Sequence, residues 1–157
     1  NRRPVDYALR QRLLDEMAPL LEHPEPAPVR AWTDAHDPRA KAYVTARLLR
    51  LRQDRPDLFT GGYRALEVEG DGEAGWVAFA REDEPAGAAL LVLVPRYPAR
   101  WPDAHAASVP LPEEWAGRAW ACTLTGTRLE AAAALEPTGL PLPWSVLVGE
   151  EAGRNGS

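Results

Sequence analysis

The side chains best suited to recognise a ligand lie together at the start of the chain, in Asn1, Arg2 and Arg3. An arginine guanidinium is a permanently charged, planar donor that can bind a sugar diol or hold a carboxylate from a loop of the site. An asparagine amide both donates and accepts hydrogen bonds, which suits recognition of hydroxyl groups. These residues form a candidate site for a hydroxyl-rich ligand, although a pair of solvated arginines before a helix would have the same sequence.

Other aromatic and reactive residues give weaker signals. The six tryptophans could stack on sugar rings, but packing inside the fold is the favoured interpretation for each of them. The histidines at positions 23, 36 and 105 lack the spacing of metal ligands. Cys122 has no histidine motif beside it and is expected to be packed. We therefore predict neither a metal site nor a cofactor.

Composition narrows the class of protein. A length of 157 residues suits one domain, or the end of a barrel followed by a small domain. The net charge of −5 argues against a nucleic-acid partner, because phosphate binding needs a basic face. The longest apolar run, residues 86–94, is too short to cross a membrane, and no secretion signal opens the sequence. With a single cysteine the default is a reducing compartment, so we predict a cytoplasmic protein.

Hydrophobic periodicity predicts helices in the first part of the chain. Residues 4–21 repeat apolar side chains at helical spacing, with Asp6 as the candidate cap, in preference to a ligand contact, and Pro19 fraying or bending the end. The proline-rich residues 23–36 are predicted to form a loop. The pair Asp37-Pro38 then signals the start of a second helix, which Pro56 ends.

After the glycines at 61 and 62 the apolar period changes from helical to strand spacing. Alternation over residues 66–69, a glycine-rich turn and residues 76–81 predict a hairpin. Residues 88–94 are apolar throughout, as a central strand buried on both faces would be. Shorter strands are predicted over residues 109–111, 118–124 and 144–148, and the tail 150–157 is expected to be disordered. Helices followed by strands suggest two structural units.

The opening residues, Asn1-Arg2-Arg3-Pro4-Val5-Asp6-Tyr7, resemble a hallmark of the malto-oligosyltrehalose synthases, which are (β/α)8-barrel enzymes of the alpha-amylase superfamily. Further similarities follow in the family's order, with an exception at residues 23–36. They are Lys41 to Arg52, Arg55-Pro56-Asp57-Leu58-Phe59, Gly62-Tyr63-Arg64-Ala65-Leu66, Ala78-Phe79-Ala80-Arg81, Val94-Pro95-Arg96, Leu111-Pro112, Trp115, Leu124-Thr125-Gly126 and Pro143-Trp144-Ser145-Val146-Leu147. We expect a piece of a longer chain, since it starts at Asn1 without methionine.

The resemblance implies an α+β fragment, in which the terminal helices of a (β/α)8 barrel precede an antiparallel β-sandwich. Residues 1–60 would be the end of the catalytic barrel, residues 61–149 the C-terminal sandwich domain and residues 150–157 the tail. Asn1, Arg2 and Arg3 would then border the active site. Lys41, one turn into its helix, would lie on the barrel face that carries the site, or would simply be solvated.

The resemblance also implies a reaction. The family converts the reducing-end α-1,4 bond of a malto-oligosaccharide to the α,α-1,1 bond of trehalose by intramolecular transglucosylation. A retaining mechanism needs two carboxyl groups about 5–5.5 Å apart, and in the family these lie on earlier barrel strands that match nothing here. The expected partners are the malto-oligosaccharide and the rest of the barrel, and the fragment alone is expected to be inactive. The alternative is a stand-alone β-sandwich that binds carbohydrate without catalysis.

Overall fold

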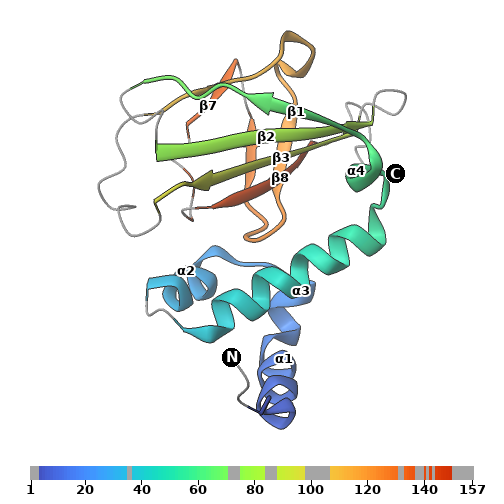
Figure 1. Cartoon of the computed structure of the whole chain (residues 1–157), viewed down its shortest axis with the longest axis vertical. Coiled ribbons are helices and arrows are strands. Elements are labelled where there is room, and N and C mark those ends of the chain that lie inside the picture. The colour runs from blue at the N-terminus through green and yellow to red at the C-terminus, as the bar shows by residue number, and fades with distance from the viewer. Residues whose placement is uncertain are drawn as a thin grey trace.

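The computed structural model describes residues 4–34, 37–70, 75–83, 88–97, 107–130, 133–136, 140, 142 and 144–149. Helices come first and strands afterwards, which confirms the α+β class. In order, the elements are α1 (Tyr7–Glu22), α2 (Pro26–Asp34), α3 (Pro38–Asp54), α4 (Asp57–Thr60), β1 (Gly62–Leu66), β2 (Trp76–Asp83), β3 (Ala88–Pro95), β4 (Val109–Pro110), the 3-10 turn η3 (Glu113–Trp115), β5 (Ala119–Cys122), β6 (Arg128–Glu130), β7 (Ala134–Leu135) and β8 (Ser145–Gly149). Figure 1 shows the strands stacked above the helices, with α3 beneath the sheet and α1 farthest from it.

The strands form a six-stranded sheet in the order β1-β2-β3-β8-β5-β6 and a two-stranded sheet of β4 and β7. All the strand pairs are antiparallel, as predicted. In Figure 1, β1, β2, β3 and β8 run across the view, and β5 and β6 (orange) run steeply behind them. The large sheet therefore bends, and its inner face encloses the core.

The two long helices begin at the residues that the sequence indicates. Asp6 caps α1, because its Oδ1 accepts a hydrogen bond of 2.8 Å from the backbone nitrogen of Leu9. Asp37 caps α3 in the same way, accepting from the backbone nitrogen of Arg39 at 2.8 Å. Pro19 does not stop α1, which continues to Glu22.

The prediction of a loop over residues 23–36 is wrong, because α2 occupies Pro26–Asp34. Pro26 and Pro28 stand in the first turn of this helix, where a backbone N–H has no intrahelical acceptor and its loss costs nothing. The density of prolines therefore marked a helix start. Apolar Val29 and Trp32, three residues apart, give the helix its inward face, and Val29 is fully buried.

The predicted hairpin exists, but its first strand lies earlier than expected. Residues Gly62–Leu66 pair with β2, so the strand ends where the alternation of residues 66–69 begins. Glu69 instead forms an isolated bridge to Ser108. Gly62, after which the apolar period changes, already lies in this strand, opposite Glu82.

The central position of β3 is confirmed, since it pairs with β2 on one edge and β8 on the other. Its two faces differ, however. Leu91 and Leu93 are 0% and 1% exposed on the inner face, whereas Val92 on the outer face is only partly buried. The expectation of burial on both faces therefore holds for one face of the strand and for Leu90 on the other.

One cluster of buried side chains extends from the helices into the sheet. The helices contribute Met17, Tyr43 and Leu58, and the strands contribute Trp120 and Leu147, among others. Burial of apolar area on this scale supplies most of the driving force for folding. The boundary predicted between residues 60 and 61 falls where α4 gives way to β1. The division into domains remains a prediction, and its tail 150–157 lies outside the described residues.

Candidate functional site

The structure places one of the four predicted site residues. Asn1, Arg2 and Arg3 lie outside the described part of the chain. Lys41 lies in the first turns of α3 with its side chain exposed, and its carbonyl oxygen accepts a hydrogen bond of 2.9 Å from Thr45 Oγ1. The amino-terminal end of α3 is therefore the region in which the predicted site can be built from observed side chains.

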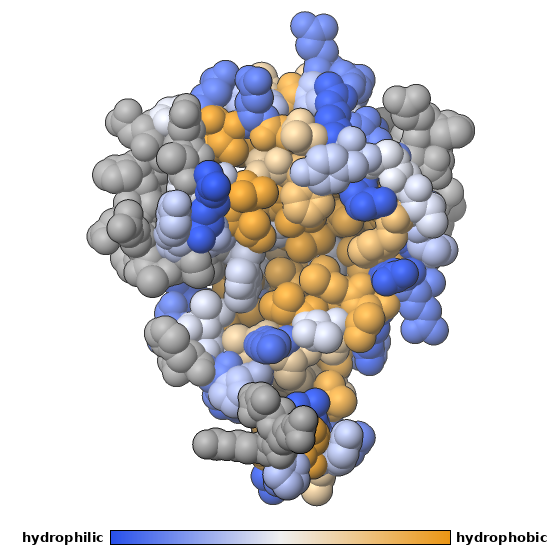
Figure 2. Space-filling view, viewed as in Figure 1, coloured by the Kyte–Doolittle hydropathy of each residue, from blue (hydrophilic) through white to orange (hydrophobic). Residues whose placement is uncertain are grey.

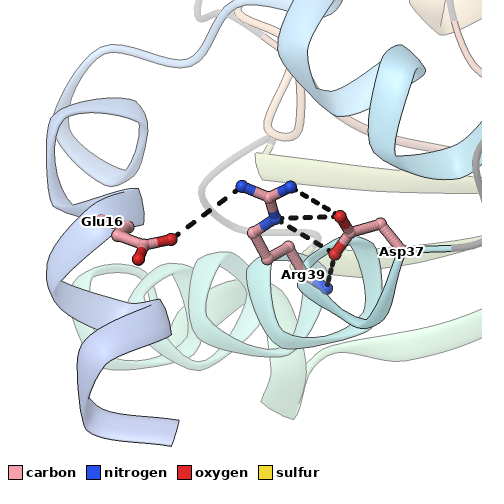
Figure 3. Close-up of polar contacts among 3 residues, drawn as sticks. All are labelled: Glu16, Asp37 and Arg39. Atoms are coloured by element: carbon pink, nitrogen blue, oxygen red, sulfur yellow. Dashed lines mark hydrogen bonds and ion pairs between the residues drawn. The ribbon is translucent and has the colours of Figure 1, made fainter. Parts of the chain in front are cut away.

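An arginine–carboxylate pair lies beside Lys41. Arg39 Nε donates to both carboxylate oxygens of Asp37, at 3.1 and 3.0 Å, and its Nη2 donates to Oδ2 at 2.6 Å (Figure 3). The same carboxylate caps α3. Charged, bidentate geometry of this kind is both directional and strong, so the start of α3 is held in one conformation.

The pair connects three helices. The guanidinium of Arg39 lies over the indole of Trp32 in α2, 5.3 Å from the ring centroid. Its Nη1 is 3.9 Å from the Glu16 carboxylate of α1, as Figure 3 shows. Trp32 also meets Tyr43 of α3 edge-on, with centroids 5.9 Å apart. We call these residues (Glu16, Trp32, Asp37, Arg39 and Tyr43) the three-helix junction.

Electrostatics at the junction favours a fixed ion pair. The hydrogen bonds from Arg39 lower the pKa of the Asp37 carboxyl below its ordinary range, and the same contact raises the pKa of Arg39. A carboxylate that stays ionised and is occupied by a cap and a guanidinium is poorly placed to donate a proton. The junction can orient neighbouring groups, but Asp37 is not suited to act as a general acid.

Other carboxyl groups show the same pattern. The pKa values of Glu22, Asp57 and Glu114 are lowered, each first of all by a side-chain hydrogen bond from an arginine, namely Arg50, Arg55 and Arg64. A glycosidase acid needs a raised pKa. The carboxyl groups of Glu22, Asp37, Asp57 and Glu114 therefore lack the raised pKa that such an acid needs.

A second junction joins α3 to the sheet. Tyr43 Oη lies 3.0 Å from the carbonyl oxygen of Leu124 and 3.3 Å from that of Leu20. Arg47 Nε donates to the carbonyl oxygen of Thr123 at 2.9 Å, and its Nη1 donates to that of Leu21 at 2.7 Å. The turn between β5 and β6 is thereby held against the end of α1 and the middle of α3.

The turn approaches the helices too closely for a side chain at its tip. Gly126 has a φ of +69°, and a Cβ at this position would lie 2.7 Å from the carbonyl oxygen of Pro24. Glycine is therefore required there both by its backbone conformation and by contact with the α1–α2 connection. In Figure 1 this turn is the loop that descends from the orange strands toward the helices.

Burial of the tryptophans agrees with packing for three of them. Trp76, Trp115 and Trp120 are 6%, 4% and 0% exposed, and Trp115 meets Trp120 edge-on at 5.5 Å. Trp32 and Trp144 are partly buried, and Trp101 lies outside the described residues. Cys122 is buried in the core, as expected. Within the described ranges, no cluster of His, Cys, Asp and Glu could hold a metal, and no helix could span a membrane.

The two junctions were not foreseen from the sequence. The sequence predicts Asp37 as a cap, but it carries no local signal for Arg39 or Trp32, and Trp32 lies in the segment for which a loop is predicted. The helical spacing of residues 38–54 places Tyr43 beside the apolar stripe of the helix and Arg47 on the other side, with Arg50 and Arg52. Only the fold shows that the acceptor of each is a carbonyl oxygen far along the chain.

The fold has a counterpart among solved structures. It superposes on a mutant of maltooligosyltrehalose synthase from Arthrobacter ramosus with a TM-score of 0.69 and 27% sequence identity. The similarity covers 95% of this chain and 18% of that enzyme's chain. No protein-family model matches the chain, and neither does any curated protein. The chain is therefore related to one part of a maltooligosyltrehalose synthase, helices and sheet together.

Proposed function

We propose that this chain is the C-terminal part of a malto-oligosyltrehalose synthase. In this role it completes an enzyme that turns the reducing-end α-1,4 bond of a malto-oligosaccharide into the α,α-1,1 bond of trehalose. The observation that carries the proposal is the similarity over 95% of this chain, at 27% identity, to an 18% share of such an enzyme. The ordered series of family-like motifs along the sequence supports it independently.

In the proposed enzyme this chain has a structural role and supplies no catalytic carboxyl group. The carboxyl groups with shifted pKa values are all held by arginines, so the nucleophile and the acid are assigned to the remainder of the enzyme. The α1–α3 helices would end the barrel. The three-helix junction would fix the end of α3 that carries Lys41, on the barrel face where such enzymes keep their chemistry.

The binding role assigned to this chain lies at its start. Asn1, Arg2 and Arg3 are proposed to border the acceptor side of the active site, where a guanidinium can hold the released glucose or a loop carboxylate. Retention of glucose in the site favours isomerisation over hydrolysis. The alternative of a stand-alone sugar-binding sandwich loses three of its six tryptophan platforms, because Trp76, Trp115 and Trp120 are buried.

The proposal is tested by exchange of parts between enzymes. In a hybrid enzyme, this chain replaces the matched segment of the Arthrobacter ramosus enzyme. We expect the hybrid enzyme to form trehalose-ended product from maltopentaose, and we expect this chain alone to form none. Titration of this chain with maltopentaose tests the alternative, which requires binding without the rest of an enzyme.

A further inference from the structure

Both ends of helix α3 carry the same side-chain arrangement, an arginine and an aspartate two positions apart in bidentate contact. At the amino-terminal end, Arg39 Nε and Nη2 donate to the Asp37 carboxylate. At the other end, Arg55 Nε donates to both carboxylate oxygens of Asp57 at 3.1 Å, and its Nη2 donates to Oδ2 at 2.7 Å. The amino-terminal pair is in addition tied to α1 and α2 through the three-helix junction.

Lys41 lies between two anchored residues of α3. Arg39 and Tyr43 are four positions apart and share one side of the helix, whereas Lys41 is two positions from each and lies on the opposite side. Arg39 is held by the junction, and the buried Tyr43 is held by the carbonyl oxygens of Leu20 and Leu124. The turn of helix that presents the exposed Lys41 is therefore fixed from behind at both of its ends.

The ion pairs of the junction are only partly buried. The side chains of Arg39, Asp37 and Glu16 are 35%, 20% and 50% exposed, and pairs with this much contact with water contribute little to stability. A planar guanidinium that binds both oxygens of a carboxylate instead fixes a direction in space. The junction thus serves to place the start of α3 more than to stabilise the fold.

A lysine side chain depends on such placement. Its ammonium group ends a long flexible stem, so the position of the backbone decides which hydroxyl group it can reach. Figure 2 shows apolar side chains over the middle of the sheet and hydrophilic side chains among apolar ones over the helices below it. Hydrogen-bonding groups for a hydroxyl-rich ligand are therefore more frequent over the helices than over the middle of the sheet.

The product of the proposed reaction is decided after glucose has been released. The anomeric hydroxyl oxygen of glucose forms a bond to the glycosyl carbon, the bond from that carbon to the nucleophilic carboxylate breaks, and the hydroxyl proton passes to the carboxyl group that acts as base. When water takes the place of glucose, the same step gives hydrolysis. A small displacement of a group that holds the glucose therefore favours hydrolysis.

We propose that Arg39 is a positioning residue for this step, an inference that rests on the proposed function. Arg39 fixes the start of α3 against α1 and α2, and it thereby fixes where the ammonium group of Lys41 meets the sugar. It acts through Lys41 and not on the substrate. Its loss is therefore expected to change the division between transfer and hydrolysis, while cleavage of the α-1,4 bond by the remainder of the enzyme continues.

The test measures the trehalose-ended product and the free glucose that the hybrid enzyme and its variants form from maltopentaose. Arg39→Ala removes the bidentate contact, and Arg39→Lys keeps the charge without the planar geometry if the alanine variant folds poorly. Arg55→Ala is the matched control, because it removes the equivalent contact at the other end of α3. We expect both Arg39 variants to lower the ratio of trehalose-ended product to glucose, Arg39→Ala by roughly fivefold or more, and Arg55→Ala to leave it unchanged.

A double variant shows whether Arg39 acts through Lys41. Lys41→Ala is expected to lower the same ratio, and Arg39→Ala is expected to lower it no further in a chain that already carries Lys41→Ala. The proposal is overturned by an unchanged ratio in the Arg39 variants or in Lys41→Ala, by an equal fall in Arg55→Ala, or by independent effects of Arg39→Ala and Lys41→Ala.

The positioning role and the proposed function fail in different ways. A hybrid enzyme with the unaltered chain that forms no trehalose-ended product refutes the proposed function, and the positioning role with it. A hybrid enzyme that forms the product at a ratio unaffected by the Arg39 variants refutes the positioning role alone.

Discussion

Arg47 Nε donates a hydrogen bond of 2.9 Å to the carbonyl oxygen of Thr123, across 76 positions of the sequence. Because Nη1 of the same guanidinium donates to Leu21 at the end of α1, one side chain joins two helices to the bent sheet. Together with Tyr43, Arg47 links α1 and α3 to the turn after β5. Under the proposed function, the β part of the chain would thereby support the helices of a barrel.

Arg47→Ala is expected to lower the free energy of unfolding by about 1.5–3 kcal/mol, since it removes charged hydrogen bonds from two partly buried carbonyl groups. Arg47→Lys is expected to recover little, because an ammonium cannot reproduce the planar fork. Urea unfolding measures both, with Arg52→Ala, an exposed arginine of the same helix, as the control. If Arg47→Ala and Arg52→Ala have the same free energy of unfolding, the hydrogen bonds of Arg47 do not stabilise the fold.

Gly126→Ala is expected to destabilise the chain more than Gly117→Ala. Both glycines have positive φ values, of +69° and +73°, but a Cβ at Gly117 meets nothing within 4 Å. The left-handed conformation alone costs about 1–2 kcal/mol with a side chain, and this sets the expectation for Gly117→Ala. The excess at Gly126 measures the contact with Pro24. Equal losses of melting temperature in the two variants would show that the chain around Pro24 moves aside at no cost.

A charged side chain is expected to unfold the chain when it is placed on the inner face of β3 but not on the outer face. Leu91→Asp places an unpaired carboxylate in the core and is expected to abolish cooperative unfolding. Val92→Asp lies on the half-buried outer face and is expected to leave the isolated chain folded. Circular dichroism during heating distinguishes the cases. Loss of the transition in both variants would show that the outer face is covered within this chain.

Acid is expected to weaken the three-helix junction. The pKa of Asp37 in the folded chain lies below its ordinary value of 3.8, because of Arg39. A lowered folded pKa contributes stability that is present above that ordinary value and is lost as the pH falls through the folded pKa. Asp37→Asn keeps a capping side chain and removes the charge. Its deficit in melting temperature against wild type should therefore shrink on going from pH 7 to pH 3, and a constant deficit would exclude the ion pair as the cause.

Local signals in the sequence predicted the elements that are built from local chemistry. Asp6 and Asp37 predict helix caps, and the unbroken apolar run of β3 predicts a central strand. Each of these features depends on residues that are neighbours in the sequence. Pro26 and Pro28 were misread because proline stands both in loops and in first helical turns. The sequence of α2 alone does not distinguish these cases.

The remaining features depend on contacts between distant parts of the chain. Arg39 meets Trp32 only because α2 exists, and Tyr43 meets Leu124 only because the β5–β6 turn descends onto α3. The partial exposure of the outer face could not be predicted either, because an all-apolar strand such as β3 predicts burial of both faces. Of the predicted site, Lys41 lies in the first turns of its helix, and the roles of Asn1, Arg2, Arg3 and Lys41 remain predictions.

The central claim is tested most directly by the amount of trehalose-ended product that the hybrid enzyme forms from maltopentaose. Three proteins are compared: the hybrid enzyme, the Arthrobacter ramosus enzyme from which the matched segment is deleted, and this chain alone. The account predicts product from the hybrid enzyme and none from the other two, because the helices and sheet restore a scaffold that carries no catalytic carboxylates. A cooperatively folded hybrid enzyme without product, or product from this chain alone, would contradict it.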